Sequence, residues 1–336
     1  MLFKTVNKLI ILVCITCFVM ADINVYTHRH YDSDKILFKR FTDITGIKVN
    51  VIKGSADQLI QRLKSEGKNS PADILLTVDA GRLVKAKELG LLQSVSSTKL
   101  LKNVPEIMRD NENQWFGLSV RARVIVYAKD KVKENELSTY EDLADPKWKG
   151  RIVVRSSNNI YNQSLMASLI ESNGSENALK WAKAIRNNMA RKPRGNDRDQ
   201  ARAVASGVAD LAIINTYYLG LLANSSDKND RKVAKKLKVF FPNQNGRGTH
   251  INVSGGAVTA SSKNKGEAIR FLEFLTENEN QKIFSESNYE YPLDYWNTKA
   301  KVHKKWGKFK GDSIHLSILG NNNADAVKIF DLAGWE

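Results

Sequence analysis

Cysteine is nearly absent from this chain, with two in 336 residues, and both of them, Cys14 and Cys17, lie close to the N-terminus. Without its first twenty-one residues the chain contains no cysteine at all. A disulfide framework, a CxxC redox pair and a thiolate metal site are then excluded. The length suits two domains, whose buried cores are large enough to be stable without disulfides.

Long apolar runs are also missing, with one exception at the N-terminus. Lys4 and Lys8 precede an apolar run over residues 9–20, and Ala21 ends a stretch that a signal peptidase can cleave. The run is shorter than the ~20 residues that a membrane-spanning helix needs. We therefore expect a signal peptide over residues 1–21, cleaved near Ala21, and a periplasmic protein. The alternative is an uncleaved N-terminal anchor.

Sequence motifs of common hydrolases are missing too. The chain has no GxSxG elbow, no HExxH zinc motif and, after residue 21, no cysteine nucleophile. Adjacent carboxylates such as Glu141 and Asp142 are too common on protein surfaces to indicate catalysis. We therefore expect a binding protein and not an enzyme.

Basic residues outnumber acidic ones, 52 against 36, which gives a formal charge of +16. Removal of Lys4 and Lys8 with the signal segment leaves 50 basic residues and a charge of +14. Such a surface suits anionic partners or an anionic membrane face, although frequent lysine can also serve solubility alone. The basic residues are spread evenly, without the aromatic-rich basic cluster of a nucleic-acid site, so we expect no nucleic-acid partner.

Strand and helix patterns alternate along the chain, which predicts an α/β fold with parallel strands covered on both faces. A helix after the first strand has Ile36, Leu37, Phe41 and Ile44 at helical spacing and ends at Gly46. Expected strands lie at 23–27, 47–52, 72–78, 151–154, 210–214 and 255–260, and expected helices at 59–63, 159–171, 216–222, 268–276 and 277–284.

Two longer extended stretches, 118–128 and 249–260, are candidates for strands that cross between two lobes. Two α/β lobes joined in this way form a clamshell, the architecture of periplasmic binding proteins, with a ligand cleft between the lobes. We assign residues 22–121 and 248–297 to an N-lobe, and residues 122–247 and 298–336 to a C-lobe.

Tyrosines recur where this architecture exposes side chains at the cleft. Tyr31 follows the first strand, Tyr161 lies at a helix start, and Tyr217 and Tyr218 follow a buried strand. In open α/β sheets ligands bind beyond the carboxyl ends of the strands. From the residues alone, ordinary packing with hydroxyls at the surface remains an alternative for all four.

From about Asp22 to Asn297 the chain resembles the periplasmic ferric-ion-binding proteins, the substrate-binding subunits of bacterial iron ABC importers, and above all their cyanobacterial type. The matching stretches are long, unusual and in the same order. They are 25–34 (VYTHRHYDSD), 41–49, 71–74, 119–124 (SVRARV), 143–150 (LADPKWKG), 194–197 and 215–220 (NTYYLG).

The resemblance implies a clamshell that closes on one ferric ion, with Tyr31 from one lobe and Tyr161, Tyr217 and Tyr218 from the other as phenolate ligands. It also implies delivery to the permease and ATPase of an importer, and we expect a monomer. Ferric iron is a hard cation that prefers oxygen ligands, and a bound cation removes the proton from a phenol whose ordinary pKa is ~10.

Further residues have roles that the resemblance suggests but leaves open. His30 is a ligand or a hydrogen-bond donor beside the ligands, and His28 is a weaker candidate. Some relatives also bind a synergistic carbonate, for which Arg121 or Arg123 would be the partner, since a guanidinium grips an oxyanion through two donors. Arg29 could instead balance the phenolate charge.

Two alternative functions remain at this point. The same clamshell could bind another ligand, such as a polyamine, thiamine or an organic anion. A passive adhesion or structural protein is a second alternative, but it would not explain where the tyrosines lie.

Overall fold

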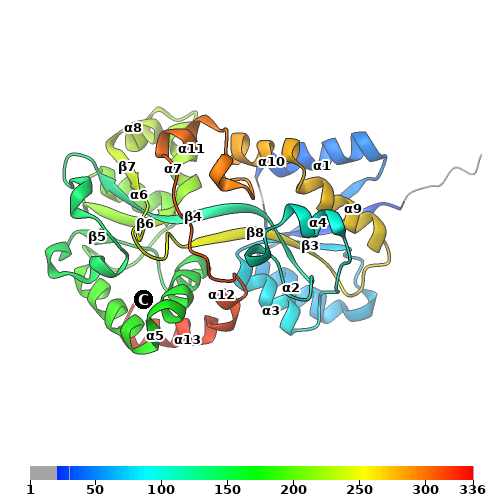
Figure 1. The fold of residues 1–336 in the computed structure, drawn as a ribbon, viewed down its shortest axis with the longest axis horizontal. Coiled ribbons are helices and arrows are strands. Elements are labelled where there is room, and N and C mark those ends of the chain that lie inside the picture. The colour runs from blue at the N-terminus through cyan, green and yellow to red at the C-terminus, as the bar shows by residue number, and fades with distance from the viewer. Residues whose placement is uncertain (1–20, 30, 336) are drawn as a thin grey trace, which may run out of the picture.

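The computed structural model describes residues 21–29 and 31–335 (Figure 1). The predicted signal segment, apart from Ala21, and the candidate ligand His30 lie outside the described residues. The strands are β1 Ile23–Thr27, β2 Val49–Lys53, β3 Ile74–Val78, β4 Phe116–Ala128, β5 Ile152–Val153, β6 Leu211–Asn215, β7 Leu237–Phe240 and β8 Ile251–Val258. The α-helices are α1 Asp32–Thr45, α2 Ala56–Glu66, α3 Ala80–Glu88, α4 Thr98–Asn103, α5 Ile160–Asn188, α6 Asp197–Ala205, α7 Thr216–Ala223, α8 Lys228–Lys236, α9 Lys265–Leu275, α10 Asn278–Ile283, α11 Lys301–Trp306, α12 Ile318–Asn321 and α13 Asn323–Ala333.

A continuous path of paired strands runs through both halves of the molecule in the order β2-β1-β3-β8-β4-β6-β5, and β7 pairs with β4 beside this path. The long strand β4 changes partners along its length. Its residues up to Ala122 pair with β8, and those from Arg123 pair with β6. Figure 1 shows β4 and β8 passing between two groups of helices, so the predicted two-lobed α/β architecture with crossing strands is confirmed. The residue boundaries assigned to the lobes stay a prediction.

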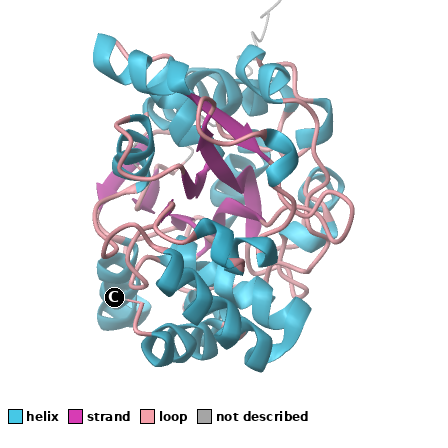
Figure 2. Cartoon of the chain, turned by 90° about the vertical axis from the view of Figure 1, so that its left-hand side faces the viewer, coloured by secondary structure: helices cyan, strands magenta, loops and turns pink. Residues whose placement is uncertain are grey.

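The strands at the centre are buried along their whole length. Every residue of β3, β4 and β8 is buried, and Figure 2 shows helices on both sides of the strands. Strands covered on both faces are continuous apolar runs because neither face meets water. This is why β3 and β6 appear in the sequence as buried-type strands.

Helix α1 has a narrower apolar face than the sequence predicted. Leu37 and Phe41, one turn apart, are buried, and the Phe41 ring meets that of Phe271 edge-on at 4.9 Å. Ile36 is 48% exposed and Ile44 is 60% exposed, so their assignment to the buried face was wrong. Ile36 lies about 100° around the helix from Leu37, which turns it away from the core.

Helix α5 continues well beyond the predicted end at residue 171. Gly174 interrupts it with a φ of 77° and a ψ of 157°, after which a second helical stretch follows. Glycine allows this conformation because it has no Cβ. Near the C-terminus α13 packs against α5, and α12 contacts both α5 and α3. The last forty residues therefore connect the two halves.

Within the described ranges, none of the helices is both long and apolar enough to cross a membrane.

Candidate metal centre

The candidate tyrosines lie at the N-terminal ends of three helices. Tyr31 directly precedes α1, Tyr161 is in the first turn of α5, and Tyr217 and Tyr218 are in the first turn of α7. Asn159 caps α5, and its side-chain oxygen accepts a hydrogen bond of 3.1 Å from the backbone N–H of Tyr161. A helix N-terminus favours negative charge, so these helix ends would help to stabilise phenolates once a bound cation has taken their protons.

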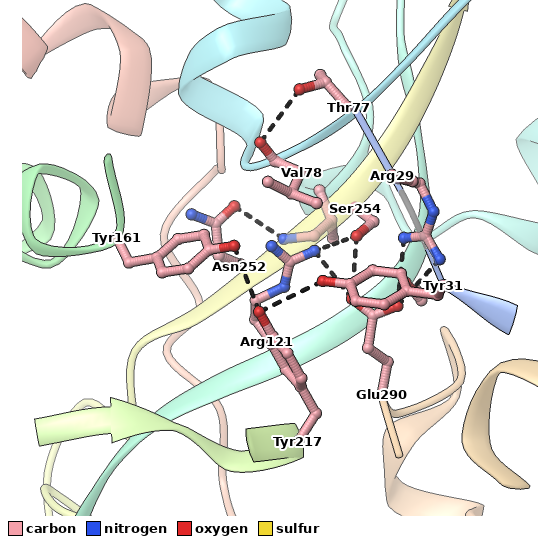
Figure 3. Close-up of polar contacts among 12 residues, drawn as sticks. Arg29, Tyr31, Thr77, Val78, Arg121, Tyr161, Tyr217, Asn252, Ser254 and Glu290 are labelled. Atoms are coloured by element: carbon pink, nitrogen blue, oxygen red, sulfur yellow. Dashed lines mark hydrogen bonds and ion pairs between the residues drawn. The ribbon is translucent and has the colours of Figure 1, made fainter. Parts of the chain in front are cut away.

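Three tyrosine hydroxyls from these helices converge on one point (Figure 3). The Tyr31 hydroxyl donates to the Tyr217 oxygen at 3.4 Å, and the Tyr161 and Tyr217 oxygens are 3.3 Å apart. The ring of Tyr218 lies 4.2 Å from that of Tyr217, centroid to centroid. Tyr217 is fully buried, and Tyr161 is 8% exposed. Tyr31 and Tyr218 are half-buried, so the cluster reaches from the interior to the edge of the cleft.

Burial raises the pKa of Tyr31 and Tyr217 well above the ordinary tyrosine value, and repulsion from Tyr161 adds to the shift. The pKa of Tyr218 is raised for the same two reasons. These phenols are therefore neutral near pH 7 in the absence of a cation. A highly charged cation at the point of convergence would reverse this, because its field stabilises the phenolates.

Arg121 lies beside the tyrosines and is only partly hydrogen-bonded. Its Nη2 donates to the Ser254 hydroxyl and to Glu290 Oε1, the latter at 3.2 Å. Its guanidinium carbon is 5.8 Å from the ring centre of Tyr161 and 5.9 Å from that of Tyr217. Its buried Nε and Nη1 have no hydrogen-bond partner within the described part of the chain. Arg121 therefore has donors to spare for an anion or for phenolate charge.

Arg123, the other candidate anion partner, has a different environment. Its Nη1 donates to Asp197 at 3.3 Å and to Asn215 at 3.1 Å, and its Nη2 donates to Asn162 at 2.6 Å. These contacts join β4 to α5, α6 and β6. They give Arg123 a structural role in one half of the molecule.

Arg29 is held by two carboxylates. Its Nη2 lies 2.9 Å from Asp34 Oδ1, and its Nη1 lies 3.2 Å from Glu290 Oε2. Its guanidinium carbon is 5.0 Å from the ring centre of Tyr31. Arg29 is thus close enough to influence a phenolate at Tyr31, but its charge is already matched by carboxylates.

Glu290 is the central residue that sequence reasoning missed. It is fully buried and bridges Arg29 and Arg121, and it also accepts hydrogen bonds from Ser119 at 2.9 Å and Ser254 at 3.0 Å. Burial would raise its pKa, but the two arginines and the two serines lower it below the ordinary value. Glu290 follows the π-helical turn Phe284–Asn288, which is far along the chain from the tyrosine segments. It belongs to no motif, so no local sequence pattern indicated it.

The remaining candidate is His28, whose Nδ1 is 3.3 Å from the backbone oxygen of Gly54. In residues 21–29 and 31–335, no group of three or more His, Cys, Asp or Glu side chains could hold a metal ion. The candidate oxygen ligands in this part of the chain are the tyrosine hydroxyls.

Sequence and structure comparisons give a consistent set of relatives. Iron uptake protein A1 of Synechocystis is 52% identical over 94% of this chain and 88% of its own length. The major ferric iron-binding protein of Neisseria meningitidis is 32% identical over 82% of each chain. A Trichodesmium protein solved in complex with iron and citrate ligands superposes with a TM-score of 0.91, with 55% identity over 94% of this chain and all of that one.

A family model described as bacterial extracellular solute-binding protein matches residues 69–310, which is most of the chain. With the relatives above, this match shows that the chain belongs to the bacterial extracellular solute-binding protein family.

Proposed function

We propose that this protein binds ferric iron in the cleft between its lobes and delivers it to an ABC importer. The observation that supports this most strongly is that the Tyr31 and Tyr161 hydroxyls both lie within 3.4 Å of the Tyr217 hydroxyl. Phenols packed this closely in a buried site gain most from a hard cation that takes their protons. The similar proteins from Synechocystis and Neisseria are an iron uptake protein and a ferric iron-binding protein, and the Trichodesmium protein was solved in complex with iron and citrate.

Tyr218 is the fourth proposed ligand, since its ring lies 4.2 Å from that of Tyr217, centroid to centroid. Four phenolates exceed the charge of one ferric ion by one. The unpartnered donors of Arg121 can balance this excess. If only three phenolates bind, the same donors suit carbonate or the carboxylate of an organic acid, because a guanidinium binds such oxyanions through two N–H groups.

We also propose how the protein is exported and where it delivers the iron. The segment 1–21 directs export and is cleaved near Ala21, the mature chain is a periplasmic monomer, and the permease and ATPase of the importer receive the iron. Because the family consists of solute-binding proteins, we expect no catalytic turnover.

A titration with ferric citrate tests the proposed ligand and its class. The protein starting at residue 22 should turn orange-red from phenolate-to-iron charge transfer, with one iron per chain at the end point. A colourless protein without ferric affinity would refute the proposal. Native mass spectra of protein purified without added iron then test the alternative, since a retained polyamine, thiamine or organic acid would support another solute.

A further inference from the structure

Asp79 has a backbone conformation that is rare for any residue other than glycine. It links the end of β3 to the start of α3 with a φ of 83° and a ψ of 122°. Strain of this kind persists only where the surroundings enforce it. Val78, the residue before Asp79, pairs with Ser254 in the register of β3 with β8, and the Ser254 hydroxyl accepts a hydrogen bond from Arg121 (Figure 3). The strained position therefore borders the candidate metal centre.

Strand β8, one of the two crossing strands, holds the backbone around Asp79. The N–H of Asp79 donates to the backbone oxygen of Val253 at 2.8 Å, and the N–H of Ala80 donates to the side-chain oxygen of Asn252 at 2.9 Å. Asn252 pairs with Arg121 in the register of β8 with β4. The position of Asp79 is thus fixed relative to the strands that join the two halves.

The side chain of Asp79 reaches across to the other half of the molecule. Its Oδ1 accepts a hydrogen bond of 2.7 Å from the hydroxyl of Ser164 on α5, as well as the capping bond of 3.0 Å from the N–H of Gly81. Both Asp79 and Ser164 are fully buried. A hydrogen bond to a buried carboxylate is among the stronger ones in proteins, because the charge has few other partners.

Ser164 lies three residues after Tyr161, which places the two side chains on one face of α5, about one turn apart. The hydrogen bond between Ser164 and Asp79 therefore holds the first turns of α5 in place relative to Asp79. The helix α12 supports this arrangement, because it packs against both α3 and α5. The position of the Tyr161 hydroxyl is therefore linked, through one hydrogen bond, to the half of the molecule that contains β1 and Tyr31.

We propose that Asp79 is a positioning residue for the metal centre. Through the Ser164 hydroxyl, its carboxylate holds the start of α5, and with it Tyr161, against the half that carries Tyr31. A side-chain oxygen that accepts this bond is needed at this place, which explains why a strained aspartate stands where glycine would fit without strain. This inference rests on the proposed ferric function.

The test measures iron release from the loaded protein to an excess of EDTA, followed by loss of the charge-transfer band. Ser164→Ala and Asp79→Gly should each speed release about tenfold, as expected for loss of a hydrogen bond to a charged group. Because both variants break the same bond, the double variant should be no faster than the quicker single one. Asp79→Asn should release iron at nearly the wild-type rate, since its amide oxygen still accepts from Ser164.

Two variants separate positioning from general stability. Asp79→Gly removes the capping bond from Gly81, but it relieves the backbone strain and glycine is well tolerated at a helix N-cap, so iron-free protein should melt no lower than wild type. Ser168→Ala removes another buried serine of α5, whose hydroxyl bonds only to the Leu165 backbone oxygen at 2.9 Å in the same helix, and should leave release unchanged. Wild-type release from both Ser164→Ala and Asp79→Gly, or equal acceleration by Ser168→Ala, would overturn the inference.

A distance measurement separates this inference from the ferric function itself. The chain beyond residue 21 has no cysteine, so spin labels can be placed on Lys64→Cys in α2 and Lys235→Cys in α8, both exposed. In iron-free protein, Ser164→Ala should broaden the distribution of distances between the labels. If wild type binds no iron, the proposed function fails, and the distance distribution of Ser164→Ala alone tests the positioning role. A broader distribution than in wild type supports that role, and an unchanged distribution overturns it.

Discussion

Tyr31 and Tyr217 are 186 positions apart in the chain, and their hydroxyl oxygens lie 3.4 Å from one another. Their rings meet edge-on with centroids 6.1 Å apart. Tyr31 precedes a helix in one half and Tyr217 begins a helix in the other, so this contact joins the two halves at the candidate metal centre.

Replacement of the paired tyrosines on α7 should abolish iron binding. Tyr217→Phe combined with Tyr218→Phe removes two oxygen ligands and keeps the apolar rings, so the fold should persist while ferric affinity falls about 100-fold or more and the colour disappears. Visible absorbance during iron titration and a thermal melt measure the two effects. Tyr127→Phe is the control, because Tyr127 is a buried tyrosine whose hydroxyl donates to Glu134, outside the centre. Unchanged colour in the double variant would show that the ligands are misassigned.

A glycine in α7 allows this helix to pack closely against the segment before Glu290. A Cβ on Gly220 would lie 2.6 Å from the Cβ of Tyr289, a contact too short for any real side chain. Tyr289 belongs to the segment that leads to Glu290 and is itself in a left-handed conformation with a φ of 59°. Gly220→Ala should therefore push the segment away and weaken ferric affinity by about tenfold, the effect of moderate overpacking.

The matched control is Gly266→Ala in α9, where an added Cβ meets no atom within 4 Å. Alanine is the better helix former, so this variant should bind iron normally and be slightly more stable. Equal affinities of the two variants, measured by chelator competition, would contradict the role given to the contact between Gly220 and Tyr289.

Glu290 should be essential for stability. Glu290→Gln leaves Arg29 and Arg121 buried with less negative charge around them, and loss of one partner from a buried ion pair costs about 3–5 kcal/mol. Urea unfolding of the iron-free protein measures this cost. The control is Glu279→Gln, since the pair of Arg40 and Glu279 is exposed and such pairs contribute about 0–1 kcal/mol. A Glu290→Gln variant as stable as the control would refute the central role of Glu290.

Iron affinity should rise with pH. Burial and mutual repulsion raise the pKa values of Tyr31, Tyr217 and Tyr218, so these phenols are protonated between pH 5.5 and 7.5 without iron. Each one that binds ferric iron releases a proton, and affinity should increase about tenfold per pH unit for every phenolate formed. Competition against a chelator of known pH dependence gives the slope. A ferric affinity that is constant across this range would exclude phenolate ligands.

The sequence predicted the parts of this protein that depend on local patterns. Buried strands such as β3 and β6 are continuous apolar runs, and Gly46 marks the end of α1 with a left-handed φ of 76°. The tyrosines were proposed as ligands because strand ends meet at one edge of a sheet and because their segments resemble a known family, and this assignment stays a prediction. Each of these signals lies within a few residues of the feature that it predicts.

The parts that sequence reasoning missed depend on contacts between distant segments. Glu290 and Asp79 become important only because Arg29, Arg121 and Ser164 come close to them in the folded chain. Neither carboxylate differs in its local sequence from an ordinary surface residue. The different environments of Arg121 and Arg123 were equally hidden. The two residues lie on the same face of β4, and only their partners, Glu290 and Asp197, distinguish them.

The most direct test of the account is a crystal structure of the iron-loaded protein with anomalous scattering recorded at the iron absorption edge. A single strong peak should lie between the oxygens of Tyr31, Tyr161, Tyr217 and Tyr218, within bonding distance of at least three of them. Iron bound elsewhere, or a cleft occupied by another solute with no iron peak, would contradict the account.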